Sequence, residues 1–389
     1  MGRELLAGVA AAAGLREGPR GVEDVLRRLA GRPGAATREL SRLTGLPVPV
    51  VAAVCGELRR LGLLTTDRPA RLSDAGRALT DGLGGAAGAG AGCPACGGRG
   101  TVLPAAYAAL AGRLEGLLAG VPAADRTLDQ AHCTVESKLR RVAYLQDAGA
   151  LSRKSVLLVG DDDQLAVAIA LAARALETPP PDRLVVVDVD PAVVAFSRDA
   201  VGRAGMDAEV VLHDLRRPLP DRLAGRFDTV FTDPPYTLAG AELFLSRGAA
   251  ALGPGPGGQA FLCFGARPPD EAARLQGAIA DMGFAIHDLV RNFNEYLGAG
   301  VLAGASHLYH LVAGSRLSPS VGGRYEAALY TGDMRPPRRT YACGTCGAHL
   351  PVGAGERWRT VEELRGQGCP RCAGRVFRPG RRAPRPGGA

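Results

Sequence analysis

Acidic residues stand at four points of the chain where a short apolar segment ends. Three follow Gly160 in a row, and the others come singly after later segments: Asp161, Asp162, Asp163, Asp188, Asp214 and Asp233. Grouped carboxylates can hold a cationic ligand and accept a proton from it, because crowding of like charges raises the pKa of at least one of them. The sequence therefore predicts a site for positively charged ligands.

The last of these carboxylates opens the motif Asp233-Pro234-Pro235-Tyr236. This motif is typical of enzymes with the S-adenosylmethionine-dependent methyltransferase fold that act on an amine nitrogen. Prolines stiffen the loop, the aromatic ring covers the acceptor, and the aspartate or its backbone carbonyl accepts a hydrogen bond from the amine. A rigid turn after a buried strand is the alternative, which the coincidence with Asp188 and Asp214 disfavours.

The loop after the first apolar segment keeps one glycine, Gly160, and has Asp161, Asp162 and Asp163 where a nucleotide-binding loop normally carries further glycines. S-adenosylmethionine presents its carboxylate to this loop, and two like charges about 4 Å apart cost on the order of 4 kcal/mol at an effective dielectric of 20. The loop therefore favours the decarboxylated molecule, which donates an aminopropyl group to polyamines. Both substrates are cations.

The acidic loop and the Asp-Pro-Pro-Tyr motif belong to a longer series of segments: Asp129-Gln130 with Thr134, Gly160–Asp163, Val187–Asp190, His213-Asp214, Phe231–Thr237, Leu243–Gly248 and Arg291–Tyr296. In this series the chain resembles the branched-chain polyamine synthases, also called bis(aminopropyl)spermidine synthases, over about residues 128–312. The resemblance implies an aminopropyltransferase built on a methyltransferase-like sheet, which adds aminopropyl groups to an internal nitrogen of spermidine and releases methylthioadenosine.

The catalytic roles follow from the need to accept a proton from the amine and to balance the charges of two cationic substrates. Either Asp162 or Asp163 is expected to serve the donor ammonium and the acceptor nitrogen, and Asp233 the acceptor. Asp161 is counted with the substrate-binding residues, and Tyr236 is expected to form a wall of the acceptor pocket.

The remaining assignments concern the ends of the two substrates. Gly160 lies in the nucleotide loop, Asp188 is expected to hold the ribose hydroxyls, and Asp214 the adenine amino group. Glu295 is expected to bind a distal polyamine ammonium, and an ordinary surface charge is an equally weighted interpretation of this residue.

Six of the nine cysteines form three Cys-x-x-Cys pairs. Cys343/Cys346 and Cys369/Cys372 are separated by 22 residues, which predicts a zinc ribbon with four thiolate ligands. Cys93/Cys96 provides only half of a zinc site. The zinc is expected to be structural, since aminopropyl transfer needs no metal.

From Ser155 onward, apolar strand patterns alternate with helix patterns, which predicts an α/β fold with a doubly wound, methyltransferase-like (Rossmann-type) sheet. Ligands of such sheets bind beyond the carboxyl ends of the strands, where the aspartates stand. The pattern of short helices in residues 18–82 predicts a winged helix. The predicted parts are a winged helix (18–82), a Cys-x-x-Cys knuckle with a helical connector (83–150), a catalytic domain (151–330), a zinc ribbon (340–376) and a disordered basic tail (377–389).

The net charge of +8 is unevenly distributed: residues 151–314 carry −6, and the segments before and after carry +5 and +9. An acidic middle suits cationic substrates, and the basic flanks leave nucleic acid open as a partner without favouring it. Glu4 makes the N-terminus a poor signal peptide, and long uncharged apolar runs are absent, so we expect a cytoplasmic protein with no membrane partner. A homodimer stays open.

Two rival functions remain. A methyltransferase acting on an amine of DNA or RNA would suit the winged helix, the ribbon and the basic tail, but the acidic loop opposes it. A non-catalytic zinc-containing regulator is disfavoured by the full set of acidic residues at the strand ends.

Overall fold

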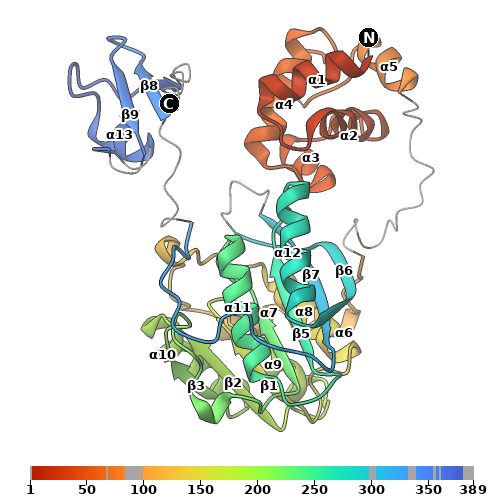
Figure 1. Ribbon diagram of the computed structural model, residues 1–389, viewed down its shortest axis with the longest axis vertical. Helices are drawn as coiled ribbons and strands as arrows, with labels where there is room; N and C mark the ends of the chain where they lie inside the picture. Colours follow the sequence, from red (N-terminus) through yellow and green to blue (C-terminus); the bar gives the residue numbers. More distant parts are fainter. Residues whose placement is uncertain are drawn as a thin grey trace. The chain divides into compact units, whose positions relative to one another are not determined.

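Figure 1 shows the computed structural model, which describes residues 2–66, 69–83, 96, 100–297, 304–331, 339–353, 356–358 and 361–379. The chain divides into two units, Met1–Ala327 and Ala328–Ala389, and each is described by itself. The first cysteine of the Cys93/Cys96 pair lies outside the described residues, so the predicted knuckle stays a prediction.

The first unit is built around a seven-stranded sheet with the order β3-β2-β1-β4-β5-β7-β6. The strands β1 to β5 are parallel to one another, whereas β7 runs antiparallel to both β5 and β6. This confirms the predicted mixed α/β fold. The strands are β1 (Ser155–Val159), β2 (Arg183–Asp188), β3 (Glu209–Leu212), β4 (Thr229–Thr232), β5 (Gln259–Phe264), β6 (Phe284–Glu295) and β7 (Ala305–Ala313).

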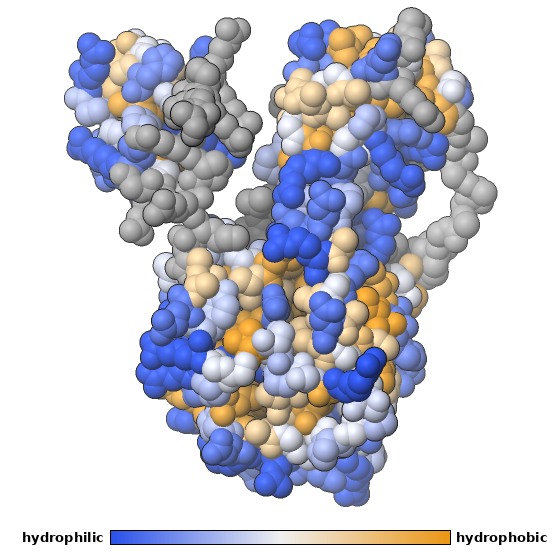
Figure 2. Space-filling view, viewed as in Figure 1, coloured by the Kyte–Doolittle hydropathy of each residue, from blue (hydrophilic) through white to orange (hydrophobic). Residues whose placement is uncertain are grey.

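Two groups of helices pack on this sheet. On one side, α9 contacts α8 and α10, and on the other, α11 contacts α12 together with β1, β4 and β5. Central strands buried on both faces need apolar sequence throughout, and Val156 to Val159 are fully buried. Figure 2 shows a mostly hydrophilic outer face on α12. The helices are α8 (Val135–Asp147), α9 (Leu165–Ala175), α10 (Pro191–Ala204), α11 (Leu238–Ala251) and α12 (Pro269–Asp281).

Side-chain caps begin two of these helices. The Thr134 hydroxyl accepts a hydrogen bond from the backbone of Ser137 at the start of α8, and the Asp190 carboxylate accepts one from Ala192 at the start of α10. Such caps satisfy backbone N–H groups that have no partner within the helix. Before α8 come the short helices α6 (Ala105–Ala108) and α7 (Ala111–Leu117) and the turn η1 (Arg126–Leu128); η2 (Asp221–Leu223) follows β3.

Five helices precede the connector: α1 (Gly2–Ala13), α2 (Gly18–Gly31), α3 (Thr37–Thr44), α4 (Val48–Arg60) and α5 (Asp74–Gly82). Their core includes the fully buried Val25, Leu26 and Leu58. Leu64 and Leu72 form an isolated antiparallel bridge between α4 and α5. The helix α1 was not predicted, and it packs on α2 and α4. Assignment of this part as a winged helix remains a proposal.

The second unit contains β8 (Arg339–Cys343), β9 (His349–Val352), α13 (Val361–Gln367) and β10 (Phe377–Pro379), with the strands in the order β10-β8-β9. Trp358 and Leu364 are buried in its small core. Residues 377–379 were predicted to begin a disordered tail, but they form β10, because their backbone pairs with that of β8. Residues 380–389 lie outside the described part.

Candidate active site

The acidic residues of the sequence gather at the carboxyl ends of β1, β2 and β4. Gly160 ends β1 with a φ of +75°, and a Cβ at this position would lie 3.2 Å from the Phe244 ring. Only glycine adopts this backbone conformation without strain. Gly160 therefore sets the direction in which the three following aspartates leave the sheet.

Asp161 is engaged at the start of α9. Its carboxylate accepts hydrogen bonds from the backbone N–H groups of Leu165 (2.6 Å) and Ala166 (3.1 Å). Burial raises its pKa to about 8, although these two hydrogen bonds act in the opposite direction. The Asp161 backbone in turn donates to Asp188 (2.9 Å), which also accepts from the backbone of Asp190 (2.8 Å). Asp161 and Asp188 thus tie the ends of β1 and β2 together.

Asp163 is held by two cations. One of its oxygens accepts from Lys138 Nζ at 3.0 Å, and the other accepts from Arg141 at 2.7 Å. The backbone N–H of Cys133 donates a third hydrogen bond, at 2.5 Å. Lys138 and Arg141 hold the pKa of the Asp163 carboxyl well below its usual range, against the opposing effect of burial. Asp163 is therefore a fixed carboxylate.

Asp162 has a different environment from its neighbour. Its carboxylate accepts a hydrogen bond from the backbone of Ala131 at 3.2 Å and forms no ion pair with any residue that the structure describes. It is half-buried, and burial, followed by the charges of Asp163 and Asp233, raises its pKa well above the ordinary value. Of the three loop aspartates, Asp162 best matches a group that exchanges a proton.

Asp233 lies across the site from the loop after β1. It accepts hydrogen bonds from Arg141 (2.5 Å) and from the hydroxyl of Tyr296 (2.6 Å), and 11% of its side chain is exposed. Burial raises its pKa to about 6, while Arg141 acts in the opposite direction. The ring of Tyr236 packs edge-on against that of Tyr296, with centroids 6.1 Å apart. The structure thus brings Asp162, Asp163, Asp233 and Tyr236 together.

Two predicted residues stand apart from this cluster. Asp214 follows β3 and accepts a hydrogen bond from the backbone of Arg216 at 2.9 Å. Glu295 ends β6, and its carboxylate pairs with the guanidinium of Arg42 in α3. Its strand neighbours Asn294 and Tyr296 bond to Arg141 instead, as expected where successive side chains point to opposite faces.

The cationic half of the site is not predicted by the sequence patterns. Lys138 and Arg141 come from α8, which lies in the predicted connector. Asn294 and Tyr296 belong to the segment Arg291–Tyr296, in which only Glu295 has a predicted role. One signal was available: Lys138 is one of only two lysines among 47 basic residues. A lysine kept where arginine is otherwise used is a hint of a position with special requirements.

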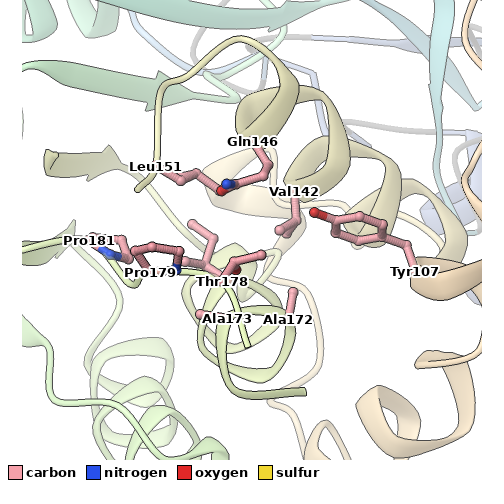
Figure 3. A pocket seen from close by; sticks show the side chains of 10 residues that line it. Tyr107, Val142, Gln146, Leu151, Ala172, Ala173, Thr178, Pro179 and Pro181 are labelled. Atoms are coloured by element: carbon pink, nitrogen blue, oxygen red, sulfur yellow. The ribbon is translucent and has the colours of Figure 1, made fainter. Parts of the chain in front are cut away.

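Other described features lie away from this site. A small hollow between the later turns of α8 and α9 is shown in Figure 3, near the residues that lead into β1. It is therefore at the amino end of β1, opposite the acidic loop. Its lining is formed by Tyr107, Val142, Gln146, Leu151, Ile169, Ala172, Ala173, Thr178, Pro179 and Pro181.

The second unit brings Cys343, Cys346, Cys369 and Cys372 together, with all four sulfur atoms within 4.8 Å of one another. The Cys343–Cys372 and Cys346–Cys369 sulfur pairs are 3.6 Å apart. Zinc bound tetrahedrally to sulfur at about 2.3 Å requires sulfur atoms about 3.8 Å apart. The four thiols therefore fit a zinc ion.

No helix of the described residues is long and apolar enough to cross a membrane. Residues 111–318 match the family described as the branched-chain polyamine synthase A C-terminal domain. This match covers α7 to β7, and so it includes both the acidic loop and the cationic helix α8.

The chain is 36% identical to an uncharacterized protein of Methanocaldococcus jannaschii, across 96% of this chain and 92% of that protein. It is 34% identical to the N(4)-bis(aminopropyl)spermidine synthase of Thermus thermophilus, across 75% of this chain and 81% of that enzyme. The corresponding enzyme of Thermococcus kodakarensis is 33% identical, with coverage of 65% and 72%.

A solved structure supports the same relationship. The branched-chain polyamine synthase from Thermus thermophilus, in complex with N4-aminopropylspermidine and 5'-methylthioadenosine, superimposes with a TM-score of 0.66 at 29% identity. The match covers 85% of this chain and 98% of that one. The family match, the curated relatives and the solved structure together confirm the predicted relationship: the chain belongs to the branched-chain polyamine synthase family of polyamine aminopropyltransferases.

Proposed function

We propose that the protein transfers an aminopropyl group from decarboxylated S-adenosylmethionine to an amine nitrogen of spermidine or a related polyamine, and releases methylthioadenosine. The observation that carries the proposal is the acidic loop after β1, in which Asp162 has no ion-pair partner among the described residues. The related Thermus thermophilus enzyme binds N4-aminopropylspermidine and 5'-methylthioadenosine, which are the two expected products.

The reaction is a direct displacement. The lone pair of the acceptor nitrogen attacks the methylene carbon next to the sulfonium, a C–N bond forms, and the C–S bond breaks with its electron pair moving to sulfur. The proton released by the nitrogen passes to a carboxylate. Of the two residues predicted for this step, the geometry favours Asp162, because Asp163 is fixed by Lys138 and Arg141.

The other roles follow the position of each residue. Asp233 and Tyr236 would contact the acceptor, since both lie beside the cluster at the carboxyl end of β4. Asp188 would hold the ribose hydroxyls and Asp214 the adenine. Glu295 would bind a distal ammonium only after that ammonium displaces Arg42. Gly160 and Asp161 would shape the loop around the donor.

Zinc would be a structural component of the ribbon. The thiols of Cys343, Cys346, Cys369 and Cys372 would bind the ion and hold the two Cys-x-x-Cys hairpins together. None of these cysteines belongs to the acidic cluster, so aminopropyl transfer itself would be carried by the carboxylates.

Nucleic acid is not favoured as a partner. In the proposed winged helix (18–82), Arg59 Nε donates to the backbone of Thr65, and Arg60 pairs with Glu57. These two arginines at the end of α4 are therefore already engaged. The remaining proposed parts are the connector (83–150), the catalytic domain (151–330) and the ribbon, which extends to Pro379.

Donor preference tests the proposal against the rival, an S-adenosylmethionine-dependent methyltransferase of DNA or RNA. The protein is incubated with each sulfonium donor and a panel of polyamines, and the products are identified by mass spectrometry. Methylthioadenosine together with an aminopropylated polyamine supports the proposal. Formation of S-adenosylhomocysteine, or equal calorimetric affinity for the two donors, would contradict it.

A further inference from the structure

The two cations of α8 are unusual for a site that binds cations. Lys138 and Arg141 lie three residues apart on one face of the helix, and they are only 4% and 1% exposed. Buried charges of this kind are costly to desolvate and contribute little net stability compared with well-packed apolar residues. Their presence therefore calls for an explanation other than stability.

Their contacts join three segments that are far apart in sequence. Arg141 donates to Asp163 in the loop after β1, to Asp233 in the loop after β4, and to Asn294 at 2.7 Å near the end of β6. Lys138 donates to Asp163 at 3.0 Å. A planar guanidinium can hold several acceptors in fixed directions, whereas an ammonium acts as a compact point charge.

The charges of the cluster can be counted. Asp162, Asp163 and Asp233 contribute three negative charges when ionised, and Lys138 and Arg141 contribute two positive ones. Among these five groups one negative charge then remains for substrates, and the contacts place it on Asp162, since both cations are directed at the other two carboxylates. The nearby Asp161 and Asp188 are already engaged by backbone N–H groups. Without the two cations, three carboxylates would compete for the same substrate cation and proton.

We propose that Lys138 and Arg141 are positioning residues, which keep Asp163 and Asp233 ionised and fixed so that Asp162 is the carboxylate that receives the proton of the acceptor nitrogen. This inference rests on the proposed aminopropyl transfer and deepens it. It changes the role of Asp163 from proton acceptor to anchor, and it predicts that removal of one internal cation shifts the acidity of the whole cluster.

The shift can be given a direction. Coupled carboxylates titrate together, so the apparent pKa values belong to the cluster. Loss of the Lys138 charge leaves Asp163 less neutralised, which makes protonation of the cluster easier and raises its apparent pKa by about one unit or more. The titratable and charged groups that face this cluster are Cys133, Lys138, Arg141, Asp161, Asp188, Tyr236, Cys263 and Tyr296.

The first experiment compares pH–rate profiles of three full-length variants with that of the wild type. In Lys138→Met, the acid limb should move to higher pH by about one unit or more, so activity lost at neutral pH returns partly at alkaline pH. Lys138→Arg, which keeps the charge, should restore the limb. Lys154→Met changes the only other lysine, which precedes β1, and should leave the profile unchanged.

The second experiment uses the fact that the chain has only two lysines. Lysine labelled with carbon-13 at the ε position gives two NMR signals, which Lys154→Met assigns. The pKa of Lys138 is raised by Asp163 against the effect of burial. In Asp163→Asn, the Lys138 signal should therefore titrate at lower pH than in the wild type.

The outcomes separate this inference from the proposed function. Inactivity of the wild type towards decarboxylated S-adenosylmethionine and polyamines refutes the proposed function, while the NMR titration still tests the ion pair. An active wild type whose profile coincides with that of Lys138→Met overturns the inference. If Lys138→Met does not fold, the NMR titration provides the test. A Lys138 signal that titrates at the same pH in Asp163→Asn and in the wild type overturns the inference.

Discussion

The acidic cluster of the sheet and the cysteine cluster of the second unit pose the same physical problem. Each collects groups that repel one another once ionised, three carboxylates in one and four thiolates in the other. In the sheet, two buried cations of the same chain, Lys138 and Arg141, neutralise most of the charge. In the ribbon, the proposed neutralising cation is a zinc ion taken from solution.

Because their neutralising cations differ in origin, the two clusters depend on their surroundings in different ways. A cluster neutralised by its own helix is organised before any ligand arrives, and it can leave one carboxylate open for chemistry. A cluster neutralised by a metal has all four ligands occupied, and it folds with the ion because metal binding and folding are coupled. The first arrangement suits catalysis and the second suits structure.

Metal removal should have the largest effect, and it should act on the ribbon and not on the acidic cluster. Structural zinc sites of small modules contribute about 10–16 kcal/mol of apparent binding free energy at pH 7, so chelation should unfold the ribbon. Trp358, the only tryptophan of the chain, is buried in this small core and reports its unfolding by fluorescence. Aminopropyl transfer should persist in the same sample.

A chain ending at Pro337 provides the matched control for chelation. It should remain active, and zinc retained by it would place Cys93 and Cys96 in a metal site of their own. A folded but inactive truncated chain would show that the ribbon belongs to the catalytic machinery, and so that the cysteine cluster is not purely structural.

Substitution of Asp162, the carboxylate without an ion-pair partner among the described residues, should have the next largest effect, a loss of turnover. Asp162→Asn keeps the shape of the side chain and removes the proton acceptor, so turnover should fall by about 10²–10⁴. The free energy of unfolding should change little, because this carboxylate pairs with no cation among the described residues. Steady-state kinetics and urea denaturation measure the two quantities, and near-normal turnover would refute the assignment of Asp162.

The anchored carboxylate should show a larger loss of stability. Asp163→Asn leaves Lys138 buried without its counter-charge and weakens the support of Arg141, and breaking a buried pair in this way costs about 3–5 kcal/mol. Asp182→Asn is the control, since the Asp182–Arg153 pair is exposed and contributes at most about 1 kcal/mol. Equal free energies of unfolding for Asp163→Asn and Asp182→Asn in denaturation experiments would contradict the role of Asp163 as an anchor.

The pH dependence of the wild type is expected to be a smaller effect. Burial raises the pKa of Asp233 from 3.8 to about 6, and in the proposed reaction the ionised form accepts a hydrogen bond from the acceptor amine. Activity (kcat/KM) should therefore fall as the pH drops through about 6. The stability term has the opposite sign: a raised carboxyl pKa favours the fold below about pH 4, and this contribution is lost as the pH rises through 6. An acid limb near pH 4 would show that the cluster is less desolvated than its burial indicates.

Much of the fold follows from local pattern. The apolar runs of β1 and β4 predict buried parallel strands, and Thr134 and Asp190 are residue types that cap helices and do begin α8 and α10. The helix α1, formed by the alanine-rich segment Gly2–Ala13, is not predicted by local pattern. Its apolar face becomes meaningful only when α2 and α4 are present to cover it.

The sequence by itself determined the kind of chemistry. Strand-end aspartates, the Asp-Pro-Pro-Tyr motif and the paired cysteines are local signals, because the adjoining strand or hairpin places them without reference to distant residues. Only the tertiary structure decided how the aspartates divide their roles. Asp162 and Asp163 are adjacent and of the same type, and they differ because α8 directs Lys138 and Arg141 at one and leaves the other open. Charge balance acts through space over a few ångströms, so it depends on which distant segments the fold brings together.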